Sequence, residues 1–261
     1  MKLAIHEIHL NVHDRGSGEP ALVFLHYWGG SARTWDAVAS RLDAARRIVA
    51  IDQRGWGDSD GPAHGYRIDE LADDAQAVIA TLGLGRYVLV GHSMGGKVAQ
   101  LLASRRPAGL EGLVLVAPSP AGGVAIPDAQ RDAMVRAYET TESTEATLDG
   151  MLTARPLAGE WRRHAIEDSV RGAPAAKRAW PTSGIREDVS SQLARIDVPT
   201  LVVAGELDRV DPVAMLEQEV VRRIAGATLH IVPGVGHLLP LEAPEVLAAR
   251  IAEFVPAAFN A

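Results

Sequence analysis

The stretch Gly91-His92-Ser93-Met94-Gly95 decides how this chain is expected to fold. It follows the apolar run 87–90 and precedes residues 97–104, which have the periodicity of a helix. In a G-x-S-x-G pattern the serine lies on a tight, strained turn from strand to helix, so the residues two before and two after it need almost no side chain. The stretch therefore predicts a strand–turn–helix unit that presents Ser93 as a nucleophile.

Outward from this unit, short apolar runs alternate with helical patterns over most of the chain. Runs that are apolar on both faces are typical of buried strands in a parallel sheet, and they lie at 21–25, 48–51, 87–90, 113–116, 200–203 and 229–232. A further strand is expected over 5–12, with helices over 68–82 and from Pro244 onward. This alternation predicts an α/β fold with a mostly parallel central sheet flanked by helices.

Residues from about 119 to 196 break the alternation, because they contain helical patterns but no convincing buried strand. A segment of this length between two core strands is too long for a plain loop, so it predicts a helical insertion. We therefore expect residues 1–118 and 197–261 to form the core domain and residues 119–196 to form a helical cap, or lid.

The composition excludes several classes of function. The 261 residues carry 26 Lys and Arg against 33 Asp and Glu, a net charge of −7, whereas nucleic acid binding needs a concentrated positive surface. The absence of cysteine rules out disulfides, thiolate metal sites and a cysteine nucleophile. No spacing of His, Asp and Glu indicates a metal site, and no stretch is typical of a signal peptide or a membrane span. We expect a cytoplasmic protein without metal, cofactor, nucleic acid or membrane partner, and leave open whether it is a monomer or a homo-oligomer.

A serine nucleophile needs a histidine base and an acidic residue that orients this base, in the chain order Ser, Asp or Glu, His. Asp208 follows one predicted buried strand and His237 follows the next. Both are therefore expected at the carboxyl edge of the sheet, where parallel sheets hold their active sites. Asp208 is preferred over Glu206, which comes too early in the turn, and over Asp211, which precedes a proline and is expected to cap the next helix.

Other polar residues are interpreted as structural. His26 and His92 are expected to hold loop backbone through hydrogen bonds rather than to move protons, and the other histidines are expected to be packed or on the surface. In the stretch 52–59, glycines allow a tight exit from a strand and charged side chains can pair within the loop. Because loops often carry function, an alternative places Trp56 near the substrate entrance.

Over nearly its whole length the chain resembles enzymes of the α/β-hydrolase fold, of the serine esterase or carboxylesterase kind. The resemblance rests on the turn at Ser93 and on the segments 26–30, 52–59, 205–208, 236–237 and 241–245. It implies Ser93 as nucleophile, His237 as base and Asp208 as its acid partner. It also implies an oxyanion hole made by the backbone N–H groups of Trp28 and Met94, and a cap at about 119–196.

The chain departs from this family at Tyr27, where a glycine usually follows the histidine of the oxyanion loop. If the backbone there needs a positive φ, tyrosine would hold it at a cost of about 1–3 kcal/mol. Otherwise the loop is arranged differently. In either case the oxyanion donor is left open between Trp28 and Tyr27.

The predicted reaction is hydrolysis of a small-molecule ester or lactone through an acyl-enzyme intermediate. The side chains expected to bind the substrate are Tyr27, Tyr138, Trp161 and Leu238. Six basic residues of the insertion are interpreted as a solvated helix face, with attraction of a carboxylated substrate as the alternative; they are Arg155, Arg162, Arg163, Arg171, Lys177 and Arg178.

Three alternatives share these residues. Cofactor-free haloperoxidases or perhydrolases, which use hydrogen peroxide as acyl acceptor, commonly have Phe before the serine, whereas this chain has His92. Hydrolases of carbon–carbon bonds usually have Asn before the serine and Trp after the histidine, whereas this chain has Leu238 at the second position. A ligand-sensing receptor built on a hydrolase scaffold can keep all three catalytic residues. Serine at position 93 rules out haloalkane dehalogenases and epoxide hydrolases, which need aspartate there.

Overall fold

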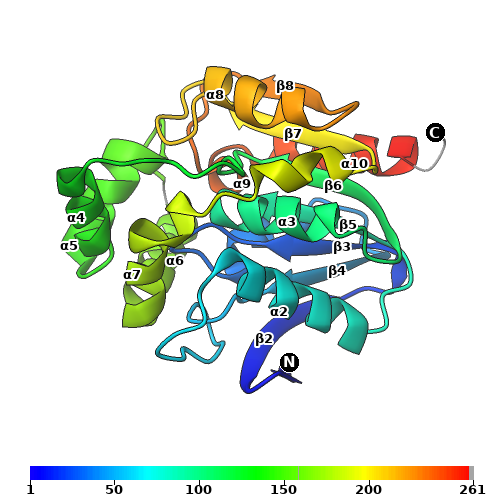
Figure 1. The fold of residues 1–261 in the computed structure, drawn as a ribbon, viewed down its shortest axis with the longest axis horizontal. Helices are drawn as coiled ribbons and strands as arrows, with labels where there is room; N and C mark the ends of the chain where they lie inside the picture. The colour runs from blue at the N-terminus through cyan, green and yellow to red at the C-terminus, as the bar shows by residue number, and fades with distance from the viewer. Residues whose placement is uncertain (158, 259–261) are drawn as a thin grey trace.

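The computed structural model describes residues 1–157 and 159–258, and the described chain contains one eight-stranded sheet (Figure 1). The spatial order of its strands is β1-β2-β4-β3-β5-β6-β7-β8. The pairs β1–β2 and β2–β4 are antiparallel and all other pairs are parallel, which confirms the predicted mostly parallel sheet. In chain order the strands are β1 (Lys2–Ile5), β2 (Ile8–Arg15), β3 (Gly18–Leu25), β4 (Arg46–Ile51), β5 (Tyr87–His92), β6 (Leu110–Val116), β7 (Thr200–Gly205) and β8 (Thr228–Val232).

Two predicted strands differ from those observed. The single strand expected over 5–12 is a hairpin, because the chain turns at His6, whose φ is 52°, and brings Ile5 opposite Ile8. Strand β8, expected to be buried on both faces, is half exposed since it lies at the edge of the sheet and pairs only with β7. Both differences arise from pairing partners that a local pattern does not reveal.

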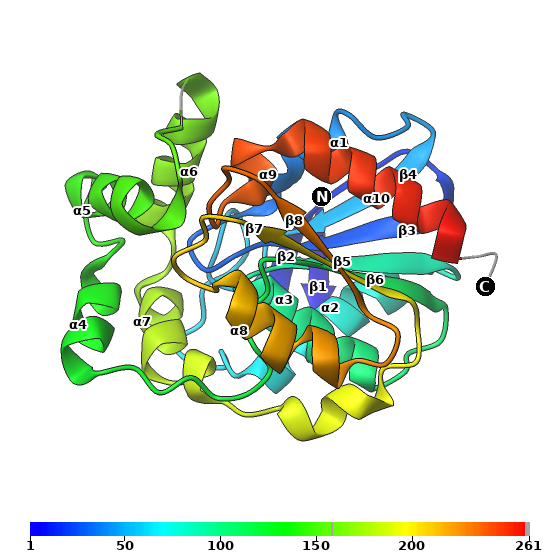
Figure 2. The same ribbon diagram turned by 90° about the horizontal axis from the view of Figure 1, so that it is seen from above.

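Helices cover both faces of the sheet (Figure 2). On one face, α2 (Ile68–Thr81), α3 (Met94–Ser104) and α8 (Val213–Glu219) pack against strand residues such as Val23 and Leu89. On the other face, α1 (Asp36–Ala39), α9 (Leu239–Glu242) and α10 (Pro244–Ala258) pack against Phe24 and Val90. Neighbouring residues of one strand thus belong to different apolar clusters, as expected for strands whose side chains alternate between two covered faces.

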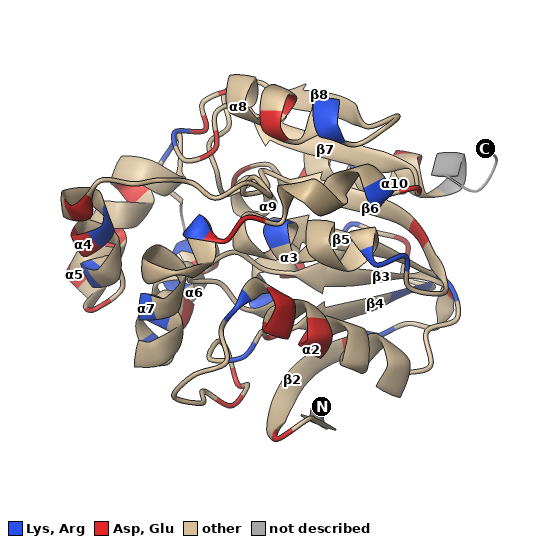
Figure 3. Cartoon of the chain, viewed as in Figure 1, with Lys and Arg blue, Asp and Glu red and all other residues tan. Residues whose placement is uncertain are grey.

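The residues between β6 and β7 form helices, with no strand among those that are described. Figure 1 shows α4 to α7 grouped beyond the carboxyl ends of the parallel strands, and the colours of Figure 3 mark both basic and acidic residues along them. Tyr138 and Trp180 from this segment belong to the same apolar cluster as the sheet residues, as do Leu193 and Ile196 at its end. The segment therefore shares an apolar core with the sheet, and the predicted boundaries of a separate cap at 119 and 196 stay a prediction. Its longer helices are α4 (Asp128–Arg136), α5 (Thr141–Thr147), α6 (Gly159–Arg171) and α7 (Pro174–Thr182).

Short helical turns complete the described structure: η1 (Ala32–Trp35), η2 (Leu148–Leu152), η3 (Gly184–Arg186), η4 (Ser190–Arg195) and η5 (Val221–Arg223). Among the described residues, no helix combines the length and the apolar character needed to cross a bilayer.

Candidate active site

Ser93 occupies the turn between β5 and α3 with φ 53° and ψ −115°, a left-handed conformation that costs a non-glycine residue about 1–3 kcal/mol. The two flanking glycines make this turn possible. A Cβ atom at Gly91 would lie 2.4 Å from the carbonyl oxygen of Gly95, and one at Gly95 would lie 2.5 Å from that of Leu25. The close approach of backbone to backbone explains why the pattern needs glycine at both positions, and the predicted strand–turn–helix unit is present.

The side chains of His237 and Asp208 are in contact with each other. The loop after β7 carries Asp208, the loop between β8 and α9 carries His237, and the Nδ1 atom of the imidazole lies 2.8 Å from Oδ2 of the carboxylate. The other oxygen, Oδ1, accepts hydrogen bonds from the N–H groups of Val210 (2.8 Å) and Asp211 (3.0 Å). Both side chains are buried, so the contact is shielded from water.

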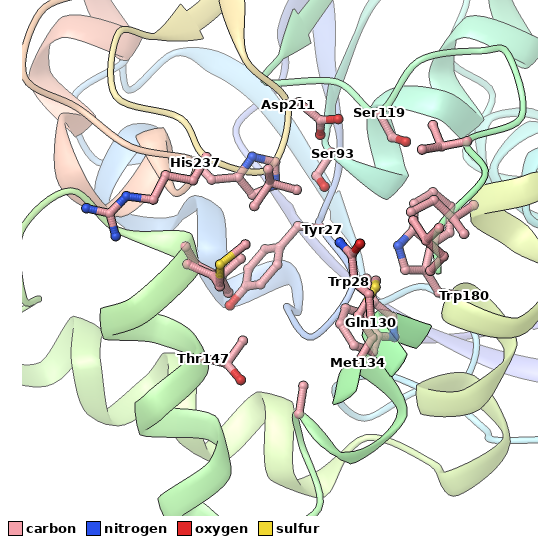
Figure 4. A pocket seen from close by; sticks show the side chains of 18 of the residues that line it. Tyr27, Trp28, Ser93, Ser119, Gln130, Met134, Thr147, Trp180, Asp211 and His237 are labelled. Carbon is pink, nitrogen blue, oxygen red and sulfur yellow. The ribbon is translucent and has the colours of Figure 1, made fainter. Parts of the chain in front are cut away.

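The electrostatic surroundings favour a proton on His237. Burial by itself lowers the pKa of this imidazole, but the charge and hydrogen bond of Asp208, with smaller contributions from Asp211 and Glu242, outweigh burial and raise the pKa above its ordinary value of 6.5. Because Nδ1 is bound to Asp208, Nε2 is the nitrogen left to face the cavity, and Figure 4 shows the imidazole turned towards Ser93. The arrangement suits a proton acceptor next to a hydroxyl group.

The backbone of His237 is held on both sides. Its N–H donates to the carbonyl of Leu152 at 2.9 Å, and its carbonyl lies 2.9 Å from Nε2 of the buried His92. His26 has a similar role in the neighbouring loop, since its Nδ1 lies 2.7 Å from the carbonyl of Tyr27 and its Nε2 accepts from the N–H of Gln53. Both histidines therefore hold loop backbone, in agreement with the sequence analysis.

Two backbone N–H groups are available beside Ser93. Those of Trp28 and Met94 have no hydrogen-bond partner within residues 1–157 and 159–258. Tyr27 is not strained, because the positive φ of this loop, 101°, belongs to Gly29. The loop thus places its left-handed residue two positions later than the glycine that Tyr27 replaces, and the predicted cost at Tyr27 does not arise.

A cavity of about 450 Å³ opens at Ser93 and His237 (Figure 4). Ser119 and Asp211 lie at the same end, and the remaining lining is mainly apolar. The sheet side supplies Tyr27, Trp28, Val210, Pro212 and Met215, and the helical segment supplies Val124, Ile126, Gln130, Ala133, Met134, Ala137, Tyr138, Thr147, Met151, Leu152, Trp180 and Ile185.

Of the four side chains predicted to bind substrate, Tyr27 and Tyr138 line this cavity, but Trp161 and Leu238 do not. Leu238 is fully buried in an apolar cluster that also contains the cavity residue Tyr27, and Trp161 packs against the same cluster from α6. An apolar side chain suits a packed core as well as a binding site, so the sequence does not distinguish the two.

Asp211 does not cap a helix as predicted, because α8 begins after Pro212 and has no side-chain cap. Its carboxyl group is buried in the cavity wall instead. Ser119 and Arg209 also line the cavity and were not predicted as site residues. The Asp208-x-x-Asp211 spacing was visible in the sequence, but the direction of the second side chain depends on how the loop packs.

Other assigned residues have structural roles. Asp52 accepts hydrogen bonds from the N–H groups of Ala32 and Asp58, and Trp56 is 2% exposed and does not line the cavity, so the alternative of an entrance residue is wrong. Glu206 is bound to the N–H of Gly234 at 2.8 Å and does not contact His237. The six basic residues of the helical segment lie outside the cavity lining, and Arg162 pairs with Asp149 at 2.6 Å. No group of three or more His, Asp or Glu in the described chain is arranged to hold a metal ion.

Comparison with known proteins agrees with this geometry. A family model described as alpha/beta hydrolase fold matches residues 20–244. The 2-(acetamidomethylene)succinate hydrolase of Mesorhizobium japonicum is 28% identical over 98% of this chain and 95% of its own, and a non-heme haloperoxidase of Rhodococcus erythropolis is 29% identical over 93% and 94%. The structure of an esterase from Exiguobacterium antarcticum superposes with a TM-score of 0.86 at 25% identity, covering 95% of this chain and 96% of the esterase. The family model covers most of the chain, and the mostly parallel sheet and the strained turn at Ser93 agree with it. This chain therefore belongs to the α/β-hydrolase fold family of enzymes.

Proposed function

We propose that this protein is a serine hydrolase that cleaves carboxylic esters, lactones included, through an acyl-enzyme intermediate. The buried 2.8 Å contact between His237 and Asp208, next to a cavity that Ser93 and His237 both line, carries this proposal. Ser93 is the nucleophile, His237 the general base and acid, and Asp208 the group that orients the imidazole.

The reaction begins when Oγ of Ser93 attacks the ester carbonyl and His237 takes the hydroxyl proton. The N–H groups of Trp28 and Met94 bind the oxyanion, and each such donor contributes on the order of 10²–10³ in turnover. His237 then passes the proton to the leaving alcohol. Water attacks the acyl-enzyme in the same way and releases the acyl group as a carboxylate.

We propose further that the helical segment acts as a cap over the acyl-binding cavity. Ala133 and Met134 of α4 line the cavity together with Ser93, although α4 lies beyond the carboxyl edge of the sheet (Figure 1). The mostly apolar lining suits the hydrocarbon part of an ester. The segment would therefore select substrates while the sheet edge performs the chemistry.

Replacing Ser93 with alanine tests the proposal. We expect Ser93→Ala to lower kcat for 4-nitrophenyl esters from acetate to decanoate by at least about 10⁴-fold, because the nucleophile is lost. Its melting temperature should stay close to that of the parent protein. The matched control is Ser104→Ala, since Ser104 is also buried on α3 but bonds only away from the cavity. Ser104→Ala should keep its activity, and ester hydrolysis that survives in Ser93→Ala would refute the assignment.

The similarity to a haloperoxidase makes peroxide the second candidate acyl acceptor. Hydrogen peroxide would attack the same acyl-enzyme and release a peracid instead of a carboxylic acid. In acetate, hydrogen peroxide and bromide, the peracetic acid formed would oxidise bromide to hypobromous acid, which brominates monochlorodimedone. The rate of this bromination measures the activity, and a rate above that of ester hydrolysis would favour it. Multiple turnover of any simple ester, in contrast to a single slow turnover, would exclude the receptor alternative.

A further inference from the structure

The cavity wall contains a buried carboxyl group, that of Asp211, with an oxygen that has no hydrogen-bond partner among the described residues. Asp211 is 5% exposed and lines the cavity at the end that holds Ser93 (Figure 4). Its backbone N–H donates to Asp208, but its carboxylate atom Oδ2 is buried without a hydrogen-bond partner among the residues described. Buried polar atoms in native proteins nearly always have a partner, so a donor that enters the cavity would complete this site.

The groups that face Asp211 are engaged elsewhere. Nζ of Lys97, on α3, lies 3.3 Å from the carbonyl of Ile185, and Nδ1 of His237 is held by Asp208. Arg209, in the same loop, donates to the carbonyl of Gly150 at 2.8 Å. Within residues 1–157 and 159–258, therefore, no cation neutralises Asp211 through a hydrogen bond.

An unpaired carboxylate in this position is costly. Burial raises the pKa of Asp211 to about 7. The nearby charges of His237 and Lys97 oppose this rise, and the charge of Asp208 adds to it. A donor that enters the cavity would remove part of the cost, because hydrogen bonds to charged groups are stronger than those between neutral groups. The site is thus better suited to a hydroxyl or ammonium group than to a carboxylate.

We propose that Asp211 is a specificity-determining residue that binds a hydrogen-bond donor, a hydroxyl or an ammonium group, on the substrate within a few bonds of the scissile carbonyl. The inference rests on the proposed ester hydrolysis at Ser93. The apolar side chains of the cavity would hold the rest of the acyl chain. A substrate with a carboxylate at the same place would be disfavoured by repulsion from Asp211.

The test compares 4-nitrophenyl esters of one chain length: butyrate, 3-hydroxybutyrate, 3-aminobutyrate and succinate. The measured quantity is kcat/KM relative to butyrate within the same variant, so that any damage to the catalytic groups cancels. At pH 8 the parent protein should prefer the amino ester by about 10-fold to 100-fold, the hydroxy ester by less, and should disfavour succinate. At pH 6, where Asp211 gains a proton, the preference for the amino ester should fall.

Two substitutions assign this preference to Asp211. Asp211→Val should bring all ratios close to one, and the isosteric Asp211→Asn should keep part of the hydroxyl preference but lose the ammonium preference. If Asp211→Val does not fold, Asp211→Asn decides. Ratios near one in the parent protein, or ratios that persist in Asp211→Asn for the amino ester, would overturn the proposal.

A binding measurement separates this inference from the catalytic one. In the Ser93→Ala background, n-butylammonium should raise the melting temperature more than 1-butanol does, and adding Asp211→Val should remove the difference. If Ser93→Ala remains active while n-butylammonium still binds through Asp211, only the catalytic assignment fails. If esters turn over but neither the ratios nor the binding depend on Asp211, only the present inference fails.

Discussion

Helices α3 and α4 differ sharply in burial, and of the two only α4 contributes side chains to the cavity lining. All eleven residues of α3 are buried, whereas none of the nine residues of α4 is. Helix α3 begins directly after Ser93 and packs against β5, while α4 lies beyond the edge of the sheet (Figures 1 and 2). The turn that carries Ser93 is thus anchored in the core, whereas α4 is a polar helix that presents a few side chains to the cavity.

The difference shows that catalysis and substrate selection have different structural requirements. Atoms that share a proton have to be held to within a fraction of an ångström, which close packing achieves. A surface that accommodates a hydrocarbon chain needs only the right size and apolar character. Substitutions at the sheet edge should therefore abolish activity, and substitutions on α4 should change substrate preference.

The largest expected effect is at Asp208. Asp208→Asn should lower kcat/KM by about 10⁴-fold, because the imidazole loses both its orientation and its partner charge. In the parent protein kcat/KM should fall as the pH drops through the raised pKa of His237, above 6.5, and the midpoint should move to lower pH in the variant. Glu206→Gln is the control, since Glu206 contacts Gly234 instead of His237. Equal losses in both variants would contradict the division of roles.

Hydrogen exchange compares helices α3 and α4 directly. Amides of α3 should exchange only through global unfolding, whereas amides of α4 should exchange at least about 10³-fold faster, because few buried contacts oppose local opening of that helix. Mass spectrometry of peptides covering 94–104 and 128–136 gives both rates in one experiment. Equal protection of the two peptides would mean that α4 opens no more readily than α3.

The free energy of unfolding of the protein should depend on pH through Asp211. Its pKa of about 7 lies above that of an unfolded aspartate, so the folded state binds more protons and the free energy of unfolding falls as the pH rises from about 4 to 7. Each pKa unit corresponds to about 1.4 kcal/mol, so a rise of about three units makes the full loss on the order of 4 kcal/mol. Asp211→Asn should lack this decline, as measured by urea denaturation at pH 5 and pH 8. The same slope in parent and variant would assign the decline to other groups.

A smaller effect is expected on α4. Ala133→Leu places a larger side chain in the cavity and should reduce kcat/KM for decanoate esters by about 10-fold while sparing acetate esters. Ala129→Leu is the matched control, because Ala129 is one turn earlier on the same helix, exposed and outside the cavity lining. A loss for all chain lengths alike would show that α4 supports the catalytic groups as well.

Much of the fold was predictable. The parallel strands are continuous apolar runs, and the helices have apolar residues at regular helical spacing. The position of Ser93 was predictable for a stronger reason: Gly91 and Gly95 are required by backbone contacts closer than any Cβ atom allows. The N-terminal hairpin was not predictable, since its turn at His6 has no glycine to mark the positive φ. Trp161 and Leu238 show the same limit at the site, where an apolar side chain suits a core as well as a cavity.

Local order along the chain was enough to predict the α/β architecture and the strained turn at Ser93, and to propose Asp208 and His237 as its partners. Each of these depends on backbone conformation or on a position at the end of a strand. The direction of Asp211, the relaxed backbone of Tyr27 and the size of the cavity depend on contacts between segments far apart in sequence. Such contacts form only when the chain is folded, and Asp208 and Asp211 illustrate the consequence: three residues apart, one is surrounded by donors and the other has a buried oxygen with none among the described residues.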